Sequence, residues 1–155
     1  MDPPLAVTVP KGWEALHLSP SFFDAGRDEE GLFSAVMFFR PAVVVGAAGG
    51  EPAATPEEAV ALLRQNDGLT VLHEERVRML GLDGIQIDLV AAHEDTQILG
   101  EGAALLGIGP DSDLRLTFLS AADGILVVGL LSPAGELEAW LRSSKPVVDS
   151  IRLVP

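Results

Sequence analysis

Two neighbouring stretches decide the fold of this chain: TVLHEERVRM at residues 70–79 and GIQIDLVAAH at residues 84–93. Both are rich in aliphatic and β-branched residues, and the second alternates between apolar and polar positions, as a half-buried strand does. The segment GLDG at residues 81–84 favours a turn between them, because glycines stand at both of its ends. The two stretches are therefore predicted to pair as an antiparallel hairpin.

Three further apolar stretches follow this hairpin, at residues 98–108, 114–120 and 125–131. Gly-Pro-Asp and Ala-Asp-Gly separate them, and both are turn signals. Strands at this regular spacing are typical of an antiparallel meander. We expect five strands in a row.

Two helices are predicted on either side of this run of strands. The segment TPEE at residues 55–58 announces the first, because Thr55 can cap it, Pro56 fits its first position and Glu58 completes a capping box. NDG at residues 66–68 ends it. The second helix is predicted to start at Ser132-Pro133, and Pro146 is expected to interrupt it before a last extended piece.

The N-terminal third is predicted to contain strands at residues 5–9, 13–18 and 33–40. Residues 24–31 are polar and end in glycine, which favours a loop, and residues 41–54 read as a long connection that allows one short strand at its start. Strands, helix, strands and helix in this order indicate an α+β fold with a mainly antiparallel sheet. At 155 residues the chain fits a single domain, residues 1–155.

Three short motifs add a resemblance to a known family: VPKGW at residues 9–13, LGLDG at residues 80–84 and VDSIRL at residues 148–153. Because these motifs stand at matching positions relative to the two helices, the chain resembles the Mog1/PsbP-like fold family, which includes PsbP, Mog1 and bacterial DcrB-like proteins. The resemblance implies an αβα sandwich whose members mostly act as binding or assembly factors rather than enzymes. It also implies that Trp13 packs against the sheet and that Ile151 returns to the core.

The charge balance narrows the choice of partners. Ten basic against 23 acidic residues give a formal net charge of −13, which disfavours nucleic acid and anionic membranes. No cysteine is present, so disulfides and thiol chemistry are excluded. The apolar runs are too short to span a bilayer, and residues 1–4 do not begin a signal peptide. We therefore expect a cytoplasmic protein, or an extracytoplasmic one from which a leader has been removed.

Familiar catalytic motifs do not occur in the sequence. There is no Gly-Lys-Ser/Thr pair for a phosphate loop, no G-x-S-x-G elbow and no H-E-x-x-H zinc motif. Asp111-Ser112-Asp113 starts like a calcium loop, but Ala122 stands where that loop needs its last acid. The sequence therefore predicts a protein that is not an enzyme and that needs no cofactor.

One cluster of candidate ligands remains, at the open end of the predicted hairpin. If Met79 pairs with Ile85, strand parity puts His73, Glu75 and His93 on the same face. Two imidazoles and a carboxylate can hold a divalent metal or act as an acid–base pair. A shift of one residue in the pairing would break the cluster.

Three functions are consistent with these patterns. The leading hypothesis is a non-enzymatic binding or assembly module that uses a sheet face, or the groove between sheet and helices, to hold a protein or an apolar small ligand. The alternative is a divalent-metal-binding protein or metal-dependent enzyme centred on His73, Glu75 and His93. A third is a sensor or immunity-type domain whose acidic surface, including Asp28-Glu29-Glu30, binds a basic partner.

Overall fold

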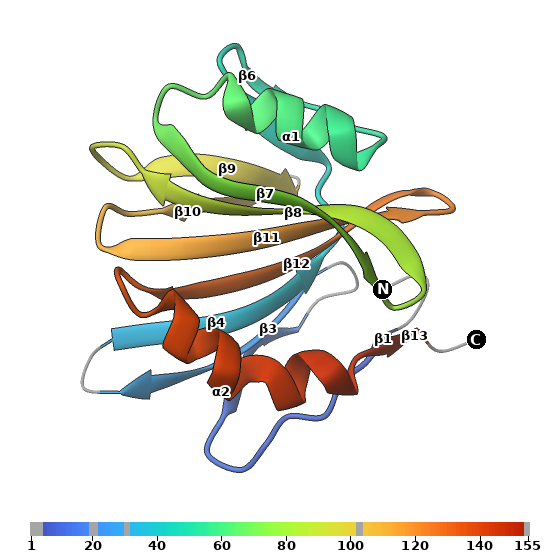
Figure 1. Cartoon of the computed structure of the whole chain (residues 1–155), viewed down its shortest axis with the longest axis vertical. Helices are drawn as coiled ribbons and strands as arrows, with labels where there is room; N and C mark the ends of the chain where they lie inside the picture. The colour runs from blue at the N-terminus through green and yellow to red at the C-terminus, as the bar shows by residue number, and fades with distance from the viewer. Residues whose placement is uncertain (1–4, 19–21, 30–31, 102–103, 154–155) are drawn as a thin grey trace.

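A seven-stranded antiparallel sheet forms the centre of the computed structural model, which describes residues 5–18, 22–29, 32–101 and 104–153 (Figure 1). Its strand order is β2-β3-β4-β12-β11-β8-β7. The bounds in chain order are β2 Glu14–Leu18, β3 Phe22–Glu29, β4 Leu32–Phe39, β7 Leu69–Met79, β8 Leu82–Ala91, β11 Ser112–Ala121 and β12 Gly124–Pro133. β2 and β7 are the two edges of this sheet.

A second, four-stranded sheet has the order β10-β9-β5-β6. Its strands are β5 Val43–Gly46, β6 Gly49–Glu51, β9 Thr96–Glu101 and β10 Ala104–Ile108. The short strands β1 (Leu5–Ala6) and β13 (Arg152–Leu153) pair with each other, which brings described segments near the two chain ends together.

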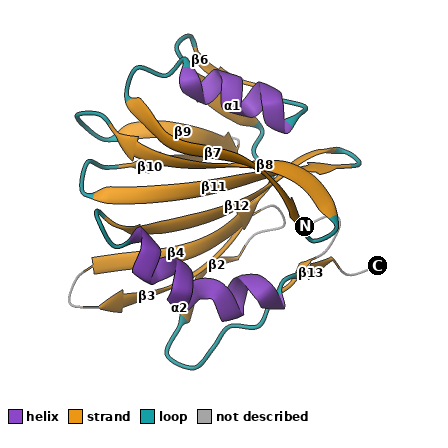
Figure 2. Ribbon diagram, in the orientation of Figure 1, coloured by secondary structure: helices purple, strands orange, loops and turns teal. Residues whose placement is uncertain are grey.

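Each face of the large sheet has its own apolar core and its own helix (Figure 2). Helix α1 (Pro56–Arg64) and the small sheet pack on one face through Ala59, Leu63 and Ile98. Helix α2 (Leu137–Ser150) packs on the other through Trp140 and Val147. The predicted α+β class and the αβα arrangement are confirmed.

The start of α1 follows the predicted capping box. The Glu58 amide donates to Thr55 Oγ1 at 3.2 Å, and Glu58 Oε2 accepts from the Ala54 amide at 2.8 Å. Helix α2 differs from its prediction at both ends: β12 extends to Pro133, so the helix begins only at Leu137, and it continues through Pro146 to Ser150. Proline is tolerated there because Val147 behind it is fully buried against the sheet and packing stabilises the last turns.

The predicted loop at residues 24–31 is wrong for the part that the structure describes, because Phe22–Glu29 is strand β3. Asp24 is buried, and the Arg27 guanidinium lies 5.4 Å from the ring centre of Trp140. Burial of one polar side chain and packing of the other against an aromatic ring are long-range features that the local polarity of this stretch does not reveal. Asp28 and Glu29 of the predicted acidic loop are part of the strand, and Glu30 lies outside the described residues.

The predicted meander is wrong in its middle. Strands β9 and β10 lie outside the large sheet: they pair with each other, and β9 also pairs with β5. The chain then returns, so that β11 lies beside β8. Strand β6, which the sequence analysis did not predict, extends the small sheet beyond β5.

Of the two anchor residues implied by the family resemblance, Ile151 lies where expected, whereas Trp13 packs on a tryptophan of helix α2 at the margin of the core. Trp13 stacks on Trp140 with ring centres 4.8 Å apart, and Ile151 is buried in the core beneath α2. Trp140 Nε1 donates to the carbonyl of Ala35 on β4 at 3.3 Å. The aromatic pair therefore fixes α2 and the N-terminal segment to the same part of the sheet.

Candidate functional site

The predicted hairpin forms, but its pairing differs from the one on which the histidine cluster depended. Met79 pairs with Leu82 and not with Ile85, because the turn consists of Leu80 and Gly81, both with positive φ (57° and 79°). Two successive residues with positive φ make a two-residue type I′ turn. A β-bulge between Val71 and His73 shifts the register further.

These shifts separate His93 from the other two candidate ligands, His73 and Glu75. His73 lies opposite Asp88, and its Nε2 is 3.8 Å from Glu75 Oε1. The predicted pairing of His93 with Val71 is wrong: Val71 pairs with Leu89, and His93 lies in the bend after β8. Within the described part of the chain, no three His, Asp or Glu side chains gather closely enough to hold a metal ion. Metal binding through His73 and Glu75 stays a prediction, which elemental analysis of the protein beside its His73→Ala variant tests.

A row of hydrogen-bonded polar side chains crosses the face of the sheet beside these residues. Gln86 Nε2 donates to Glu75 Oε1 at 2.7 Å, and Gln86 Oε1 accepts from Thr117 Oγ1 at 3.4 Å. Both Gln86 and Thr117 are buried. The buried Gln86 and Thr117 bond to each other, and Gln86 bonds to Glu75, so this polar row fixes the register of β7, β8 and β11.

An ion pair continues the polar row. Arg115 donates to both carboxylate oxygens of Asp88, from Nε at 2.6 Å and from Nη2 at 2.8 Å. The hydrogen bond to Asp88 raises the pKa of Arg115 above its ordinary value, although burial of the guanidinium opposes this shift. Glu138 in the first turn of α2 raises it further. Because two parallel hydrogen bonds fix the guanidinium against the carboxylate, we interpret this pair as part of the fold rather than as a binding site.

The opposite side of β7, which faces helix α1, is not filled by such a row, because two hollows lie between this strand and the helix. One hollow of about 420 Å³ and another of about 320 Å³ both contact Glu57 and Arg76. We call this surface the α1–β7 groove. Its lining residues are Pro56, Glu57, Val60, Ala61, Arg64, Glu74, Arg76, Val77, Arg78, Asp83, Gly84, Ile85 and Ser120.

Three ion pairs stand along the α1–β7 groove. Arg64 Nη2 lies 2.5 Å from Glu74 Oε2, and Arg76 Nη1 lies 3.2 Å from Glu57 Oε1. The third, between Arg78 Nη1 and Asp83 Oδ1, measures 3.4 Å. The last two pairs are open to solvent; the Arg76 side chain is 80% exposed. Such pairs contribute only about 0–1 kcal/mol each, so their side chains are free to exchange partners.

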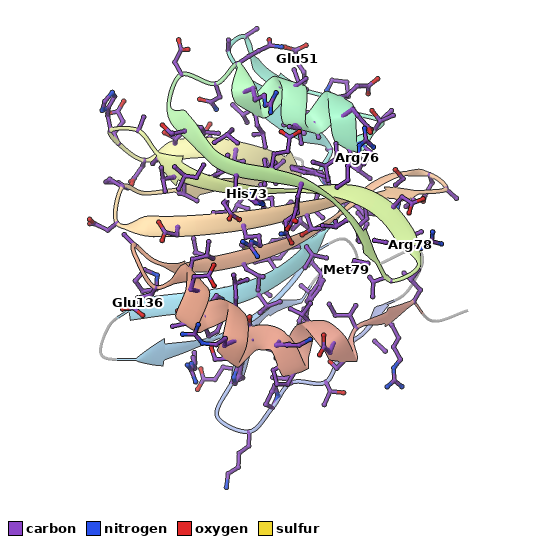
Figure 3. All side chains as sticks on the ribbon, in the orientation of Figure 1. Glu51, His73, Arg76, Arg78, Met79 and Glu136 are labelled. Atoms are coloured by element: carbon purple, nitrogen blue, oxygen red, sulfur yellow. The ribbon has the colours of Figure 1, made fainter. Side chains whose placement is uncertain are left out.

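Figure 3 labels His73, Arg76 and Arg78 among the side chains. His73 and Arg76 come from the same strand, and Arg76 and Arg78 project from β7 near α1 and the hairpin tip. Three of the chain's ten Lys and Arg residues line this groove, together with the three acidic residues that pair with them. The sequence analysis proposed a groove between sheet and helices as one possible binding surface, but it identified none of the residues of this groove. The alternation of Glu74, Arg76 and Arg78 was the available signal, because same-face charges on a strand indicate an exposed edge.

Comparisons with known proteins agree with this architecture. No family model matches the chain, and no curated protein matches it. Among solved structures, cyanobacterial PsbP (CyanoP) from Synechocystis sp. PCC 6803 is similar over 99% of this chain and 88% of its own, with a TM-score of 0.52 and 10% identity. The chain thus has the Mog1/PsbP-like fold that its motifs suggested.

Two other solved structures overlap most of the chain. LpqN, a protein involved in cell envelope biogenesis of Mycobacterium tuberculosis, has 8% identity and a TM-score of 0.46, with 97% of this chain and 83% of LpqN covered. A structure from Bacteroides thetaiotaomicron has 11% identity and a TM-score of 0.49, with 97% of this chain and 45% of that one covered. Neither helix within the described ranges is long and apolar enough to cross a membrane.

Proposed function

We propose that this protein is a non-enzymatic binding module that holds a segment of a partner protein in the α1–β7 groove. The observation that carries the proposal is the position of the groove, which runs between a helix and the edge strand of the large sheet. Its apolar floor includes Val60 and Ile85, and charged side chains stand on both sides. A floor of this kind with a charged rim suits a polypeptide better than an apolar small molecule.

The polar row on the other face supports this choice of site. Its side chains bond to one another, whereas the arginines of the groove form exposed pairs that a partner can replace. The Mog1/PsbP-like fold adds an analogy, since members of that family mostly act as binding or assembly factors.

Site-specific photo-crosslinking tests the proposal. A photoreactive phenylalanine replaces Arg76 in the groove or, as the control, the exposed Arg142 on α2. In the cells that make the protein, we expect a discrete crosslinked protein from position 76 that is absent from position 142. Adding Ala61→Arg, which fills the exposed groove wall of α1, should reduce that product. The same products from positions 76 and 142, unchanged by Ala61→Arg, would contradict the proposal.

A further inference from the structure

The edge of β7 that faces away from β8 carries unpaired main-chain groups. β7 is the last strand of its sheet, and no other strand of the described residues pairs with it from outside. A type I′ turn closes on a hydrogen-bonded pair, here Met79 and Leu82, and such pairs then recur at every second residue along an antiparallel ladder. Odd-numbered residues of this part of β7 therefore bond to β8. The N–H and C=O groups of Glu74, Arg76 and Arg78 point outward.

The side chains of these same three residues line the α1–β7 groove. Main-chain donors and acceptors and the charged side chains are thus available to one incoming strand. The bulge after Val71 ends the regular edge, so the usable stretch runs from residue 73 to residue 79. Just before it, Leu72 is 62% exposed and offers an apolar contact at the end of the stretch.

The charges along this stretch select the chemistry of the partner. Arg76 and Arg78 are alternate residues on the groove side, and a paired strand places its own side chains directly opposite them. Acidic side chains at two alternate positions of the partner would meet both arginines, whereas basic ones would be repelled. Glu74 competes less for the partner, because its side chain is only 33% exposed and lies 2.5 Å from Arg64, whereas the acids paired with Arg76 and Arg78 are more exposed and farther from their arginines.

We propose that the partner segment is an extended acidic strand that adds to the free edge of β7 and places alternate carboxylates on Arg76 and Arg78. This inference rests on the proposed function and specifies its partner. Affinity comes from main-chain hydrogen bonds to residues 74, 76 and 78, as in other cases of strand addition. Selectivity comes from the two arginines, which exchange Glu57 and Asp83 for the incoming carboxylates.

Fluorescence anisotropy with labelled synthetic peptides tests the inference. The probe is acetyl-Thr-Val-Glu-Val-Glu-Val-Thr-amide, and its charge control replaces both Glu by Lys. We expect the acidic peptide to bind on the order of tenfold more tightly than the basic one, since two like-charge contacts replace two attractive ones. In an antiparallel ladder, the peptide residues opposite Arg76 and Arg78 are the ones whose main-chain N–H groups bond to β7. A version of the acidic peptide that is N-methylated at both Glu should therefore lose binding, whereas N-methylation of the central Val, whose N–H points away from β7, should not.

A charge reversal in the protein completes the cycle. The variant with Arg76→Glu and Arg78→Glu should prefer the basic peptide, while reversal of the exposed Arg142 on α2 should leave the original preference unchanged. Equal binding of both peptides, or a preference that the double variant does not reverse, would overturn strand addition. The free edge of β7 could instead pair with a second copy of the chain, and sedimentation velocity detects such a dimer. A dimer that the acidic peptide fails to dissociate would also overturn the proposed strand addition. If crosslinking from position 76 succeeds while the peptides fail, the proposed function stands and only the acidic strand is wrong.

Discussion

Two ion pairs of the large sheet differ in almost every physical respect: Arg115–Asp88 joins two of its strands, and Arg76–Glu57 joins its edge strand β7 to helix α1. The first is bidentate, with side chains only 17% and 12% exposed, and it belongs to the polar row. The second is a single contact of 3.2 Å between open side chains on the groove. The comparison teaches that burial, rather than charge itself, separates the pairs that specify the fold from those that remain available to a partner.

The largest effect is expected from breaking the buried pair. In Asp88→Ala, the Arg115 guanidinium loses its carboxylate while it stays mostly buried. Removal of one partner from a buried pair costs about 3–5 kcal/mol of unfolding free energy. Urea unfolding followed by circular dichroism measures it, with Asp83→Ala of the exposed Arg78–Asp83 pair as the matched control. A loss in Asp88→Ala no larger than in the control would show that burial does not distinguish the two pairs.

A smaller loss is expected within the polar row. Thr117→Val keeps the shape of a buried side chain but removes the hydroxyl that donates to Gln86. The 3.4 Å contact is long, and a lost hydrogen bond of this kind costs about 1 kcal/mol. Equilibrium unfolding of Thr117→Val beside Ser120→Ala, an exposed residue on the same strand, measures the difference. Equal stability of the two variants would mean that the row contributes no net free energy.

The sequence predicted features formed by residues close together in the chain, but not those formed by distant residues. Thr55 and Glu58 lie three residues apart, so their capping box was predicted correctly. The hairpin strands were also found, but Leu80 adopts a positive φ that usually selects Gly or Asn, and the turn was therefore placed too late. That displacement produced the wrong pairing of His93.

The candidate groove depends on contacts that no short window of sequence contains. Glu57 on α1 and Arg76 on β7 are 19 residues apart in the chain. Buried Asp24 and the contact of Arg27 with Trp140 explain in the same way why β3 was mistaken for a loop. A charged stretch was therefore predicted correctly as exposed only where its charged side chains contact solvent or residues nearby in the sequence.

A third pair, Arg40–Asp123, lies between the two extremes, because its arginine side chain is 17% exposed and its aspartate 60%. The hydrogen bond from Arg40 lowers the pKa of Asp123 below its ordinary value. Since the folded-state pKa is depressed, this pair stabilises the fold above the unfolded-state pKa, and the contribution is lost as the pH falls through the folded-state pKa. NMR titration of the Asp123 carboxyl should show the low pKa, and Arg40→Ala should return it toward the ordinary value. A pKa that Arg40→Ala leaves unchanged would assign the shift to another cause.

The smallest change in stability is expected at the groove, where the effect on binding should be largest. Arg76→Ala removes one exposed ion pair with Glu57, so the unfolding free energy should change by less than about 1 kcal/mol. The same substitution deletes one of the two charges that meet the acidic strand, and it should weaken the acidic peptide several-fold. Urea unfolding and peptide anisotropy on one preparation measure both quantities, with Arg142→Ala as the exposed control. A residue that is dispensable for folding and required for binding is the signature of a functional surface, whereas a stability loss comparable to that of Asp88→Ala would place Arg76 among the structural pairs.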